Sequence, residues 1–324
     1  MNNYIAITIG DIKGIGIKIF FETLQNKQIK NTILFTNIRI IEEYIKKNNI
    51  GIEINIVNLN NNKINFSDNK LNIYTYKCKS LEENTYKSLK YAYNSCIKKF
   101  CIGMITLPLR KDIIIRKIDK KFIGHTEFYQ KMDNKIYSNM ILYHNKIMIS
   151  TLTTHIEIKK ISNFIKKNNF LYNQILNLNN TLVKDFNIKK PKLIISGLNP
   201  HAGENGSIGM EEVEIINPVI NKIRKTGILI DGPLSADSIL IKKNINKYDC
   251  FIFIYHDQAL IPFKFISQFT GVNYTGNLNI IRTSPDHGTA YQLIKSKEYS
   301  NKSFINCYRL VKKIYKNRLI NDLR

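Results

Sequence analysis

The stretch Ile5-Ala-Ile-Thr-Ile9, closed by Gly10, decides the fold class that this sequence predicts. The apolar run has the length of a buried strand, and residues 17–24 beyond it have a helical composition. The pattern therefore predicts a strand, a tight turn and a helix. The turn Gly10-Asp-Ile-Lys-Gly-Ile-Gly16 matches neither the GxGxxG dinucleotide fingerprint nor the P-loop, so by itself it indicates only a βα connection.

The same alternation of strand and helix patterns continues along the chain, which is typical of an α/β protein with a parallel sheet. A polar, Asn-rich segment at 59–71 is expected to be a surface loop. Further strands are expected at 31–36, 51–57, 103–106, 191–196 and 249–255, and further helices at 39–48, 82–100, 161–186 and 211–224.

The length of 324 residues suggests about two lobes at roughly 150 residues each. No Pro-rich or Ser-rich linker separates them, so we expect strands to cross between the lobes. Lys and Arg total 49 against 25 Asp and Glu, a formal charge of +24, and 44% of residues are hydrophobic, which is a globular composition. Because the lysines are spread along the whole chain, we expect no specific nucleic-acid partner, only weak binding to polyanions.

No apolar run approaches the roughly 18 residues that a membrane-spanning helix needs. The start, Met1-Asn-Asn-Tyr-Ile5, lacks the basic region of a signal peptide. We therefore expect no membrane partner and a cytoplasmic protein. The cysteines agree with a reducing compartment, because they form no CxxC pair, and we interpret them as buried thiols. They are Cys78, Cys96, Cys101, Cys250 and Cys307.

Functional residues of an α/β sheet concentrate in the loops after its strands. Polar segments, each containing a histidine, follow five strand-like runs of this chain. They are Gly124-His-Thr-Glu127 after Phe122-Ile123, Thr153-Thr-His155 after Ile147-Met-Ile149, Gly197-Leu-Asn-Pro-His-Ala-Gly-Glu204 after Ile194-Ile195, His256-Asp-Gln258 after 251–255, and Arg282-Thr-Ser-Pro-Asp-His-Gly-Thr289 after Ile280-Ile281.

Three of these histidines, His155, His201 and His256, suggest a metal site, because neutral imidazoles that meet in one crevice bind a divalent ion of the zinc type. Their spacing carries no local signature, so three unrelated loop histidines explain the sequence as well. Arg282 is a candidate for binding a phosphate or carboxylate, since arginine is scarce here and grips such groups with two hydrogen bonds. In so lysine-rich a chain, Lys264 is the weaker candidate.

Long multi-residue segments occur in a fixed order between about Ile7 and Leu293. They include the first four segments above, Gly209-Met-Glu-Glu212, Gly232-Pro-Leu-Ser-Ala-Asp237, Gly271-Val-Asn273 and Ile281-Arg-Thr-Ser-Pro-Asp-His-Gly-Thr289. Such a series is far more specific than any single motif. It resembles the 4-hydroxythreonine-4-phosphate dehydrogenase family, which acts in pyridoxal phosphate biosynthesis.

The resemblance implies a two-lobed α/β/α fold like that of isocitrate and isopropylmalate dehydrogenases. It also implies a homodimer whose active site lies in the cleft between the lobes and at the subunit interface. We place the lobes at about 1–123 with 275–324, and at 124–274. By motif match, His155, His201 and His256 would bind the metal, His125, Thr126, Lys264, Asn273 and Arg282 would contact substrate, and His287, Gly288 and Thr289 would bind the cofactor.

The implied reaction is the oxidation of the C3 hydroxyl of 4-phosphooxy-L-threonine with NAD or NADP. It is followed by decarboxylation of the resulting 2-amino-3-oxo acid. A divalent ion such as zinc, magnesium or cobalt would favour loss of the hydroxyl proton. The base that removes this proton is left open among Lys264, Asp237 and a metal-bound hydroxide.

The sequence departs from the family pattern near the cofactor segments. Ile12-Lys13 and Ile17-Lys18 stand where the family has Pro-Ala and Pro-Glu, and Pro108-Leu-Arg-Lys111 stands in place of Pro-Ile-Asn-Lys. Ile294-Lys295 stands where Ala-Gly is expected. The residues that match the family's metal and phosphate contacts are unchanged. These departures are therefore expected to affect the affinity for the cofactor.

Two other functions fit parts of the sequence. A sister dehydrogenase for a four-carbon sugar-acid phosphate, threonate or erythronate 4-phosphate, would need the same metal and phosphate contacts without an amine site. A non-catalytic protein that keeps the fold would not need all the site residues, yet all of them are present, which favours an enzyme.

Overall fold

The computed structural model describes residues 3–59, 64–167, 169–295 and 298–323. The chain divides into two compact units, each built from two segments. Unit 1 comprises Met1–Asn134 and Leu278–Tyr315, and unit 2 comprises Lys135–Asn277 and Lys316–Arg324. These bounds differ from the lobes placed on the sequence, because 124–134 belongs to unit 1, and 275–277 and 316–324 belong to unit 2.

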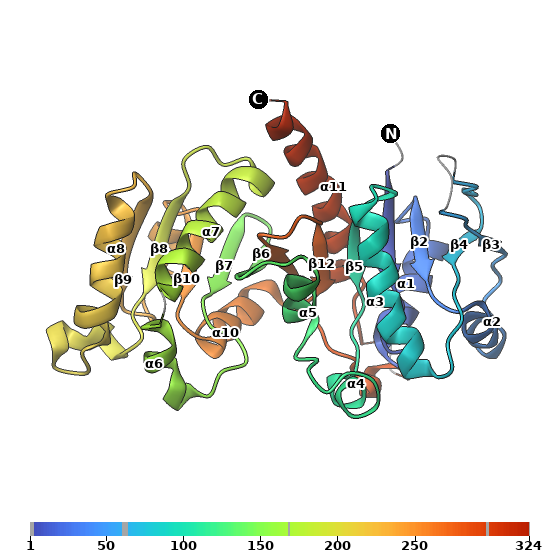
Figure 1. The fold of residues 1–324 in the computed structure, drawn as a ribbon, viewed down its shortest axis with the longest axis horizontal. Coiled ribbons are helices and arrows are strands. Elements are labelled where there is room, and N and C mark those ends of the chain that lie inside the picture. The colour runs from blue at the N-terminus through green and yellow to red at the C-terminus, as the bar shows by residue number, and fades with distance from the viewer. Residues whose placement is uncertain (1–2, 60–63, 168, 296–297, 324) are drawn as a thin grey trace. The chain divides into compact units, whose positions relative to one another are not determined.

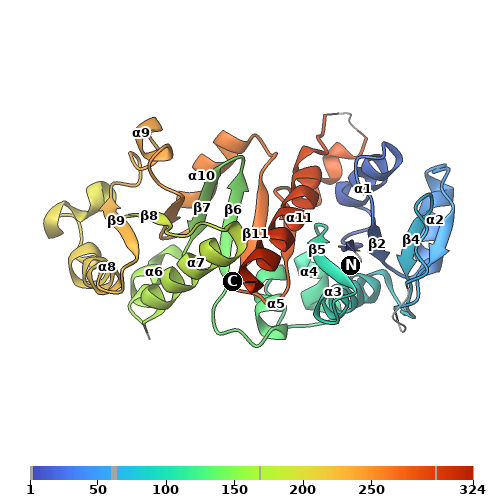
Figure 2. The same cartoon turned by 90° about the horizontal axis from the view of Figure 1, so that it is seen from above.

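Unit 1 is built on a parallel sheet with the strand order β3-β4-β2-β1-β5-β12 (Figure 1). Seen from above, α1 and α3 lie on opposite faces of its strands (Figure 2). The strands are β1 (Tyr4–Thr8), β2 (Thr32–Phe35), β3 (Ile54–Ile56), β4 (Leu71–Tyr74), β5 (Cys101–Thr106) and β12 (Arg282–Pro285). The helices are α1 (Ile15–Gln25), α2 (Ile38–Lys47), α3 (Leu81–Ile97), α4 (Lys111–Lys117), α5 (His125–Met132), the short η4 (Tyr291–Leu293) and α11 (Lys302–Asp322), whose last turns belong to unit 2.

Local chemistry explains the first elements of unit 1. Gly10 has φ +61°, and a Cβ there would lie 2.6 Å from the carbonyl oxygen of Pro108, so only glycine fits this turn. Helix α3 begins where the Ser80 hydroxyl accepts a hydrogen bond from the backbone N–H of Glu83 at 3.1 Å. Glu82 and Glu83 in the first turn favour the same helix start.

Unit 2 combines parallel strands with an antiparallel hairpin, in the order β11-β6-β7-β10-β8-β9. Strand β6 pairs antiparallel with both β7 and β11, and the other pairs described are parallel. The strands are β6 (Asn139–His144), β7 (Ile147–Thr151), β8 (Lys192–Ser196), β9 (Leu229–Leu234), β10 (Cys250–Phe253) and β11 (Val272–Gly276). The helical segments are η1 (Ile158–Lys160), α6 (Ile161–Ile165), α7 (Phe170–Phe186), η2 (Pro200–Gly206), the π-helix η3 (Glu212–Ile216), α8 (Asn217–Arg224), α9 (Lys242–Ile245) and α10 (His256–Ser267).

Helices cover both faces of the unit 2 strands: α10 lies on one face and α7 on the other (Figure 2). The core between β10, β8 and α10 is apolar and includes Ile194, Phe251, Phe253 and Phe263. Unit 1 has its own core, which includes Ala6, Phe35, Leu89 and Tyr129. The α/β class is therefore confirmed, and each unit has a core of the kind that a separate lobe needs.

Several expectations about individual elements are wrong. The sheet is not wholly parallel, and the single helix expected at 161–186 is two helices, α6 and α7; residue 168 between them lies outside the described residues. The expected loop 59–71 ends at Leu71, where β4 begins, and residues 60–63 are outside the described part. Residues 122–123 form no strand, and Arg282 begins β12 where a loop was expected.

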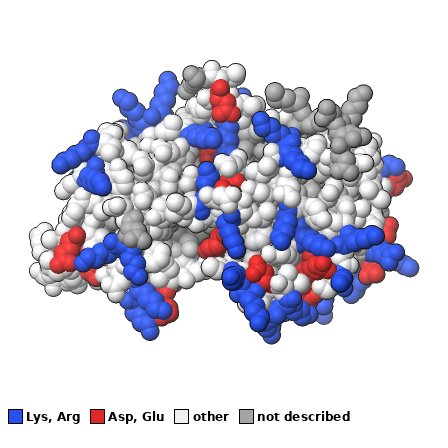
Figure 3. Space-filling view, viewed as in Figure 1, with Lys and Arg blue, Asp and Glu red and all other residues white. Residues whose placement is uncertain are grey.

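The cysteines are free, but Cys78 and Cys96 are only partly buried, whereas the other three are buried as expected. On the face drawn in Figure 3, Lys and Arg side chains are scattered, with Asp and Glu among them. Among the described helices, none has both the length and the apolar character needed to cross a membrane.

Candidate active site

In unit 2, His155 and His256 come together because their strands are neighbours. His155 follows β7 and His256 begins α10 directly after β10, and these strands pair in parallel. Thr153 joins the two strand ends, since its backbone N–H and its hydroxyl both donate to the carbonyl of Ile254, at 3.0 and 2.8 Å. The two imidazole rings lie 6.2 Å apart between centroids, with their planes inclined by 36°.

The ring of His256 has one nitrogen engaged by its neighbour in the chain. Its Nδ1 is hydrogen-bonded to the Asp257 carboxylate at 2.7 Å, which is the partner that a metal-binding imidazole commonly has on its second nitrogen. Gln258 ties the start of the same helix to the neighbouring strand. Its Nε2 donates to the Gly197 carbonyl at 3.0 Å, and its Oε1 accepts from the Ile254 backbone N–H at 3.1 Å.

His201 lies in η2, an unusual loop in which His201, Ala202, Gly203, Glu204 and Asn205 all have positive φ. The buried Glu212 organises this loop from η3. Its Oε1 accepts from the backbone N–H groups of Leu198 at 2.7 Å and Asn199 at 2.9 Å, and its Oε2 accepts from the Asn199 side chain at 2.9 Å. Left-handed backbone is costly for non-glycine residues, so these contacts are what holds the loop in shape.

Of the three predicted metal ligands, the structure thus shows two close to each other. His155 and His256 form a pair, and their imidazoles are chemically suited to a divalent ion. His201 is exposed and lies close enough to Asp237 to lower the pKa of that carboxyl. Within the residues described, no three His, Cys, Asp or Glu side chains are arranged to hold a metal ion. The structure therefore brings together two of the three ligands.

The other predicted residues of unit 2 lie on α10, on β11 and after β9. Asn273 has its Oδ1 buried with no hydrogen-bond partner, which is unusual for a buried polar atom. The Lys264 ammonium lies 4.6 Å from the centre of the Phe269 ring. Asp237 is exposed in a turn, where hydrogen bonds from the Ser235 hydroxyl and from its own backbone N–H, and then the nearby His201, hold the pKa of its carboxyl below the usual range.

In unit 1, Arg282 is 2% exposed and its guanidinium is fixed by Thr106. Its Nε and Nη2 donate to the Thr106 hydroxyl at 3.0 and 2.6 Å. Burial lowers the pKa of Arg282 to about 10, and the group still carries its charge at neutral pH. The structure therefore places a buried positive charge on β12, which corrects the loop position expected from the sequence.

His125 begins α5, with Thr126 next to it and partly buried. The His125 Nε2 is buried and has no hydrogen-bond partner. Burial, and then the positive charges of Arg282 and Lys111, lower the pKa of this imidazole well below its usual value, so it is neutral at neutral pH. A neutral imidazole with one unsatisfied nitrogen is equipped to hydrogen-bond a polar ligand.

The predicted cofactor loop packs on the first turn of unit 1. The carbonyl of Thr289 accepts from the backbone N–H of Ile15 at 2.9 Å, and the Tyr291 hydroxyl donates to the Asp11 carboxylate. His287 and Gly288 lie beside this contact, where the ring Nδ1 meets the Gly288 carbonyl at 2.9 Å.

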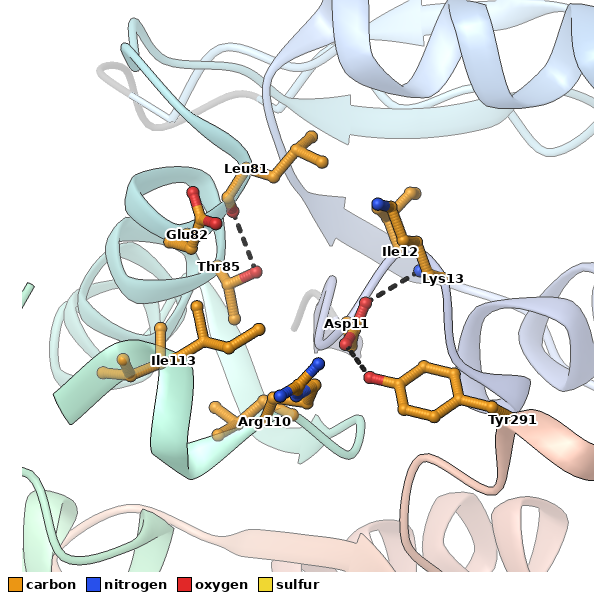
Figure 4. Close-up of a pocket in the computed structure, with 11 residues that line it drawn as sticks. Asp11, Ile12, Lys13, Leu81, Glu82, Thr85, Arg110, Ile113 and Tyr291 are labelled. Carbon is orange, nitrogen blue, oxygen red and sulfur yellow. Dashed lines mark hydrogen bonds between the residues drawn. The ribbon is translucent and has the colours of Figure 1, made fainter. Parts of the chain in front are cut away.

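A cavity of about 340 Å³ opens beside this contact. Figure 4 shows Asp11 and Tyr291 joined on one side of it, with Glu82 and Thr85 of α3 on the other. Its walls carry both signs of charge among apolar side chains. The lining residues are Asp11, Ile12, Lys13, Leu81, Glu82, Thr85, Leu109, Arg110, Ile113, Ile114 and Tyr291.

The departures from the family pattern gather in this region. Ile12, Lys13 and Arg110 line the cavity. Lys18 and Ile294 also differ from the family pattern, and the Lys18 ammonium donates to the carbonyl of Ile294 at 2.9 Å. Three of the changed residues therefore line one cavity, and two others are joined by a hydrogen bond.

Comparison with solved structures first defines the class. The 4-hydroxythreonine-4-phosphate dehydrogenase of Klebsiella pneumoniae has the same fold, with a TM-score of 0.83 over 97% of this chain and 98% of its own, at 24% identity. The fold is also that of a terephthalate 1,2-cis-dihydrodiol dehydrogenase from Burkholderia xenovorans, at a TM-score of 0.62 and 20% identity over 96% of this chain and 98% of the other. The chain thus has a fold that dehydrogenases use.

The sequence defines the particular family. The model of the family described as pyridoxal phosphate biosynthetic protein PdxA matches residues 24–311, and the chain belongs to this family. The chain is 34% identical to a 4-hydroxythreonine-4-phosphate dehydrogenase from Wigglesworthia glossinidia brevipalpis over 92% of each chain, and 31% identical to one from Aquifex aeolicus over 96% of this chain and 98% of that one. The resemblance inferred from the motifs is confirmed, and the chain is an oxidoreductase of pyridoxal phosphate biosynthesis.

Sequence reasoning assigned no role to Glu212, Gln258 or Lys111, although each lies in a quoted motif. The signal for Glu212 was a carboxylate shortly after a glycine-rich loop whose N–H groups need acceptors. Gln258 could have been found because it follows directly after a strand, where a side-chain amide can donate to one loop and accept from another. The loop that Glu212 holds lies 13 and 14 residues earlier in the chain, and Gln258 bonds both the nearby Ile254 and the distant Gly197.

Proposed function

We propose that the chain oxidises 4-phosphooxy-L-threonine with NAD or NADP to 2-amino-3-oxo-4-phosphooxybutanoate, which then decarboxylates to 3-amino-2-oxopropyl phosphate. The observation that carries this proposal is the pair of unsatisfied buried atoms, His125 Nε2 and Asn273 Oδ1. His125 lies in unit 1 and Asn273 in unit 2, each at a position that the family motifs assign to substrate, where a polar ligand group would complete the hydrogen bonding of that atom.

The substrate contacts in this proposal are His125, Thr126 and Arg282 of unit 1 and Lys264 and Asn273 of unit 2. The buried guanidinium of Arg282 attracts a phosphate or carboxylate, and the Thr106 hydroxyl holds it in place. The neutral His125 ring offers Nε2 to the same ligand without adding a charge. Binding and stabilising a charged substrate needs side chains that are oriented before it arrives. The burial of the Arg282 side chain and of His125 Nε2 agrees with this need.

The oxidation moves a hydride from C3 and a proton from its hydroxyl. NAD or NADP would supply the hydride acceptor, and we place it beside His287, Gly288 and Thr289, in the segment that leads to Tyr291 at the cavity wall. A divalent ion of zinc, magnesium or cobalt, held by His155, His201 and His256, would supply positive charge at the hydroxyl oxygen.

The proton needs an acceptor on this chain. The lowered pKa of Asp237 makes it a weak base near neutral pH, so we place Lys264 first and Asp237 second for this role. Replacing Lys264 with Met should abolish turnover, whereas Asp237→Asn should leave most of it. The opposite ranking would assign the base to Asp237.

A second copy of the chain is part of the proposal, as the family resemblance implies a homodimer. Support comes from α10, which starts at His256 and exposes Ile261 (71%) and Phe265 (79%). Large apolar side chains exposed together favour burial against a partner. The variant Phe265→Lys should lower the molar mass measured by light scattering, whereas Ile97→Lys on unit 1 should not. A wild-type monomer would contradict the homodimer.

The direct test measures reduced cofactor by absorbance with purified protein, a divalent metal and 4-phosphooxy-L-threonine. NAD and NADP are supplied in separate reactions, EDTA is added to a control, and carbon dioxide release is measured in parallel. A rise that EDTA abolishes is expected with the amino substrate. A rise only with threonate or erythronate 4-phosphate would assign the sister activity, and no rise with any of them would overturn the proposal.

The substrate site is tested separately with Asn273→Ala. The KM for the phosphorylated substrate should rise roughly tenfold or more, because a buried hydrogen bond to the ligand is lost, while the KM for the cofactor stays the same. Asn246→Ala, an exposed change in the same unit, is the matched control. We also expect the protein to act in the cytoplasm, in agreement with its free cysteines.

A further inference from the structure

Two charged side chains of unit 1, Lys111 and Glu127, both come close to the backbone of Gly124, the residue before His125. Lys111 is the first residue of α4, and Glu127 lies in the first turn of α5. A Cβ placed on Gly124 would be 2.9 Å from Glu127 Oε2 and 3.2 Å from Lys111 Nζ, and these are the two side chains nearest to that point. The ammonium and the carboxylate therefore converge over the backbone of Gly124.

This cluster faces the same imidazole as Arg282. The charges that act on His125 come from Arg282 on β12 and from Lys111 on α4. Glu127 on α5 acts on Arg282, and the Tyr129 ring is stacked parallel to the His125 ring at 6.5 Å. His125 is therefore surrounded by two cations, one carboxylate and aromatic rings.

The balance of charge around His125 favours an anionic ligand. Two positive groups and one negative group leave an excess of one positive charge beside a neutral ring whose Nε2 has no partner. Lys111 is exposed, so a ligand can reach its ammonium without displacing α4. A lysine and an arginine on either side of a neutral hydrogen-bonding group suit a phosphate or carboxylate.

We propose that Lys111 is a further binding residue for the anionic group of the substrate, and that Glu127 positions its ammonium over Gly124, next to His125. The chemical class of the ligand is a phosphate monoester or a carboxylate. The identity of the substrate in this inference rests on the proposed function. The existence of the anion site does not.

Gly124 leaves space for this arrangement. Its φ of 174° is ordinary extended backbone, so the requirement is one of space and not of conformation. A methyl group there would lie 2.9 Å from Glu127 Oε2 and 3.2 Å from Lys111 Nζ, so the ends of these two flexible side chains would have to shift slightly. Gly124→Ala is therefore expected to weaken phosphate binding less than Lys111→Met does.

The test measures the His125 imidazole by NMR in the metal-free full-length protein, with His125→Gln used to assign its resonance. In Lys111→Met the midpoint of the His125 titration should move to higher pH, because a nearby positive charge is gone. Inorganic phosphate should bind about tenfold or more weakly. Lys111→Arg should restore both properties, and Lys121→Met, an exposed lysine of the same unit, should change neither.

An unchanged His125 titration or unchanged phosphate affinity in Lys111→Met would overturn the inference, as would failure of Lys111→Arg to restore them. In turnover assays, Lys111→Met should raise the KM of the phosphorylated substrate and leave that of the cofactor unchanged. If wild-type protein oxidised none of the substrates but still bound phosphate through Lys111, the proposed function would fail and the anion site would stand.

Discussion

The imidazole rings of His155 and His256 lie 6.2 Å apart, inclined by 36°, at the ends of the neighbouring parallel strands β7 and β10. Parallel strands end at the same edge of a sheet, so loops that are far apart in sequence meet there. Asp257 hydrogen-bonds the Nδ1 of His256 and leaves Nε2 available. This pair is the part of the expected metal site that the structure brings together.

The first prediction concerns metal content. His256→Ala and His155→Ala should each bind less zinc, cobalt or magnesium than wild type after dialysis, because each change removes an imidazole donor. His201→Ala should do the same if the third ligand acts as the family motif implies. Elemental analysis measures the bound metal.

His144→Ala is the matched control for these variants, since His144 belongs to the same unit and hydrogen-bonds Thr270 and Asn145. Its metal content should equal that of wild type. Wild-type metal content in His155→Ala and His256→Ala would rule out the pair as ligands.

The second prediction concerns Glu212, which holds the loop that carries His201. Glu212→Ala removes the acceptor of two backbone N–H groups and one side-chain amide, so the free energy of unfolding should fall by about 3 kcal/mol. If His201 binds metal, the metal affinity should also fall by about 10-fold to 100-fold. Urea unfolding measures the first effect and metal titration the second.

Glu214→Ala provides the comparison, because Glu214 lies on the same π-helix and is exposed. It should change the unfolding free energy by less than about 0.5 kcal/mol. Equal effects of the two variants would show that Glu212 does not organise the loop.

The third prediction concerns a buried ion pair in unit 2. Arg318 Nε donates to Asp185 Oδ1 at 2.6 Å, and the residues are 9% and 2% exposed. The Tyr274 hydroxyl also donates to Asp185. Asp185→Asn should lower the free energy of unfolding by about 3–5 kcal/mol, because it leaves the buried guanidinium without its counter-charge. Urea unfolding is the measurement.

The double variant Asp185→Leu with Arg318→Met tests the reason for this loss. It removes both charges and should lose less stability than Asp185→Asn does, since no unpaired charge stays buried. A loss below about 1 kcal/mol for Asp185→Asn would contradict the prediction, because burial of a lone charge costs more than that.

The fourth prediction concerns pH. The pKa of His125 is well below its usual value in the folded protein, whereas in the unfolded chain it is about 6.5. Above pH 6.5 the ring is neutral in both states. As the pH falls below this value, the unfolded chain binds a proton that the folded protein does not. Stability should therefore be complete above about pH 6.5 and decrease below it, by up to about 1.4 kcal/mol per pH unit.

Urea unfolding of metal-free protein between acidic and neutral pH measures this dependence. His125→Gln should show a shallower decrease than wild type, because one proton-binding group is removed from the unfolded chain. His144 also has a lowered pKa through burial, so part of the decrease should persist. The same slope in wild type and His125→Gln would contradict the assignment to His125.

Much of the fold was predictable from local sequence patterns. The runs that became β1, β2, β5, β8 and β10 are continuous and apolar, as strands buried on both faces require. Strand β11, Val-Asn-Tyr-Thr-Gly, alternates polar and apolar residues and pairs antiparallel, so it lacked this signal. Arg282 was predicted in a loop because the apolar run Ile280-Ile281 before it was interpreted as the strand, whereas the strand begins at Arg282, whose partner Thr106 lies on β5.

The sequence by itself determined the α/β class, the family and the residues that are candidates for the site, because strand periodicity and long ordered motifs are local properties of the chain. Only the tertiary structure decided which candidates meet. It paired His155 with His256, placed His201 beside Asp237, and brought Lys111 and Glu127 together over Gly124. These contacts depend on strand order and on how helices pack, which join residues that no local pattern relates.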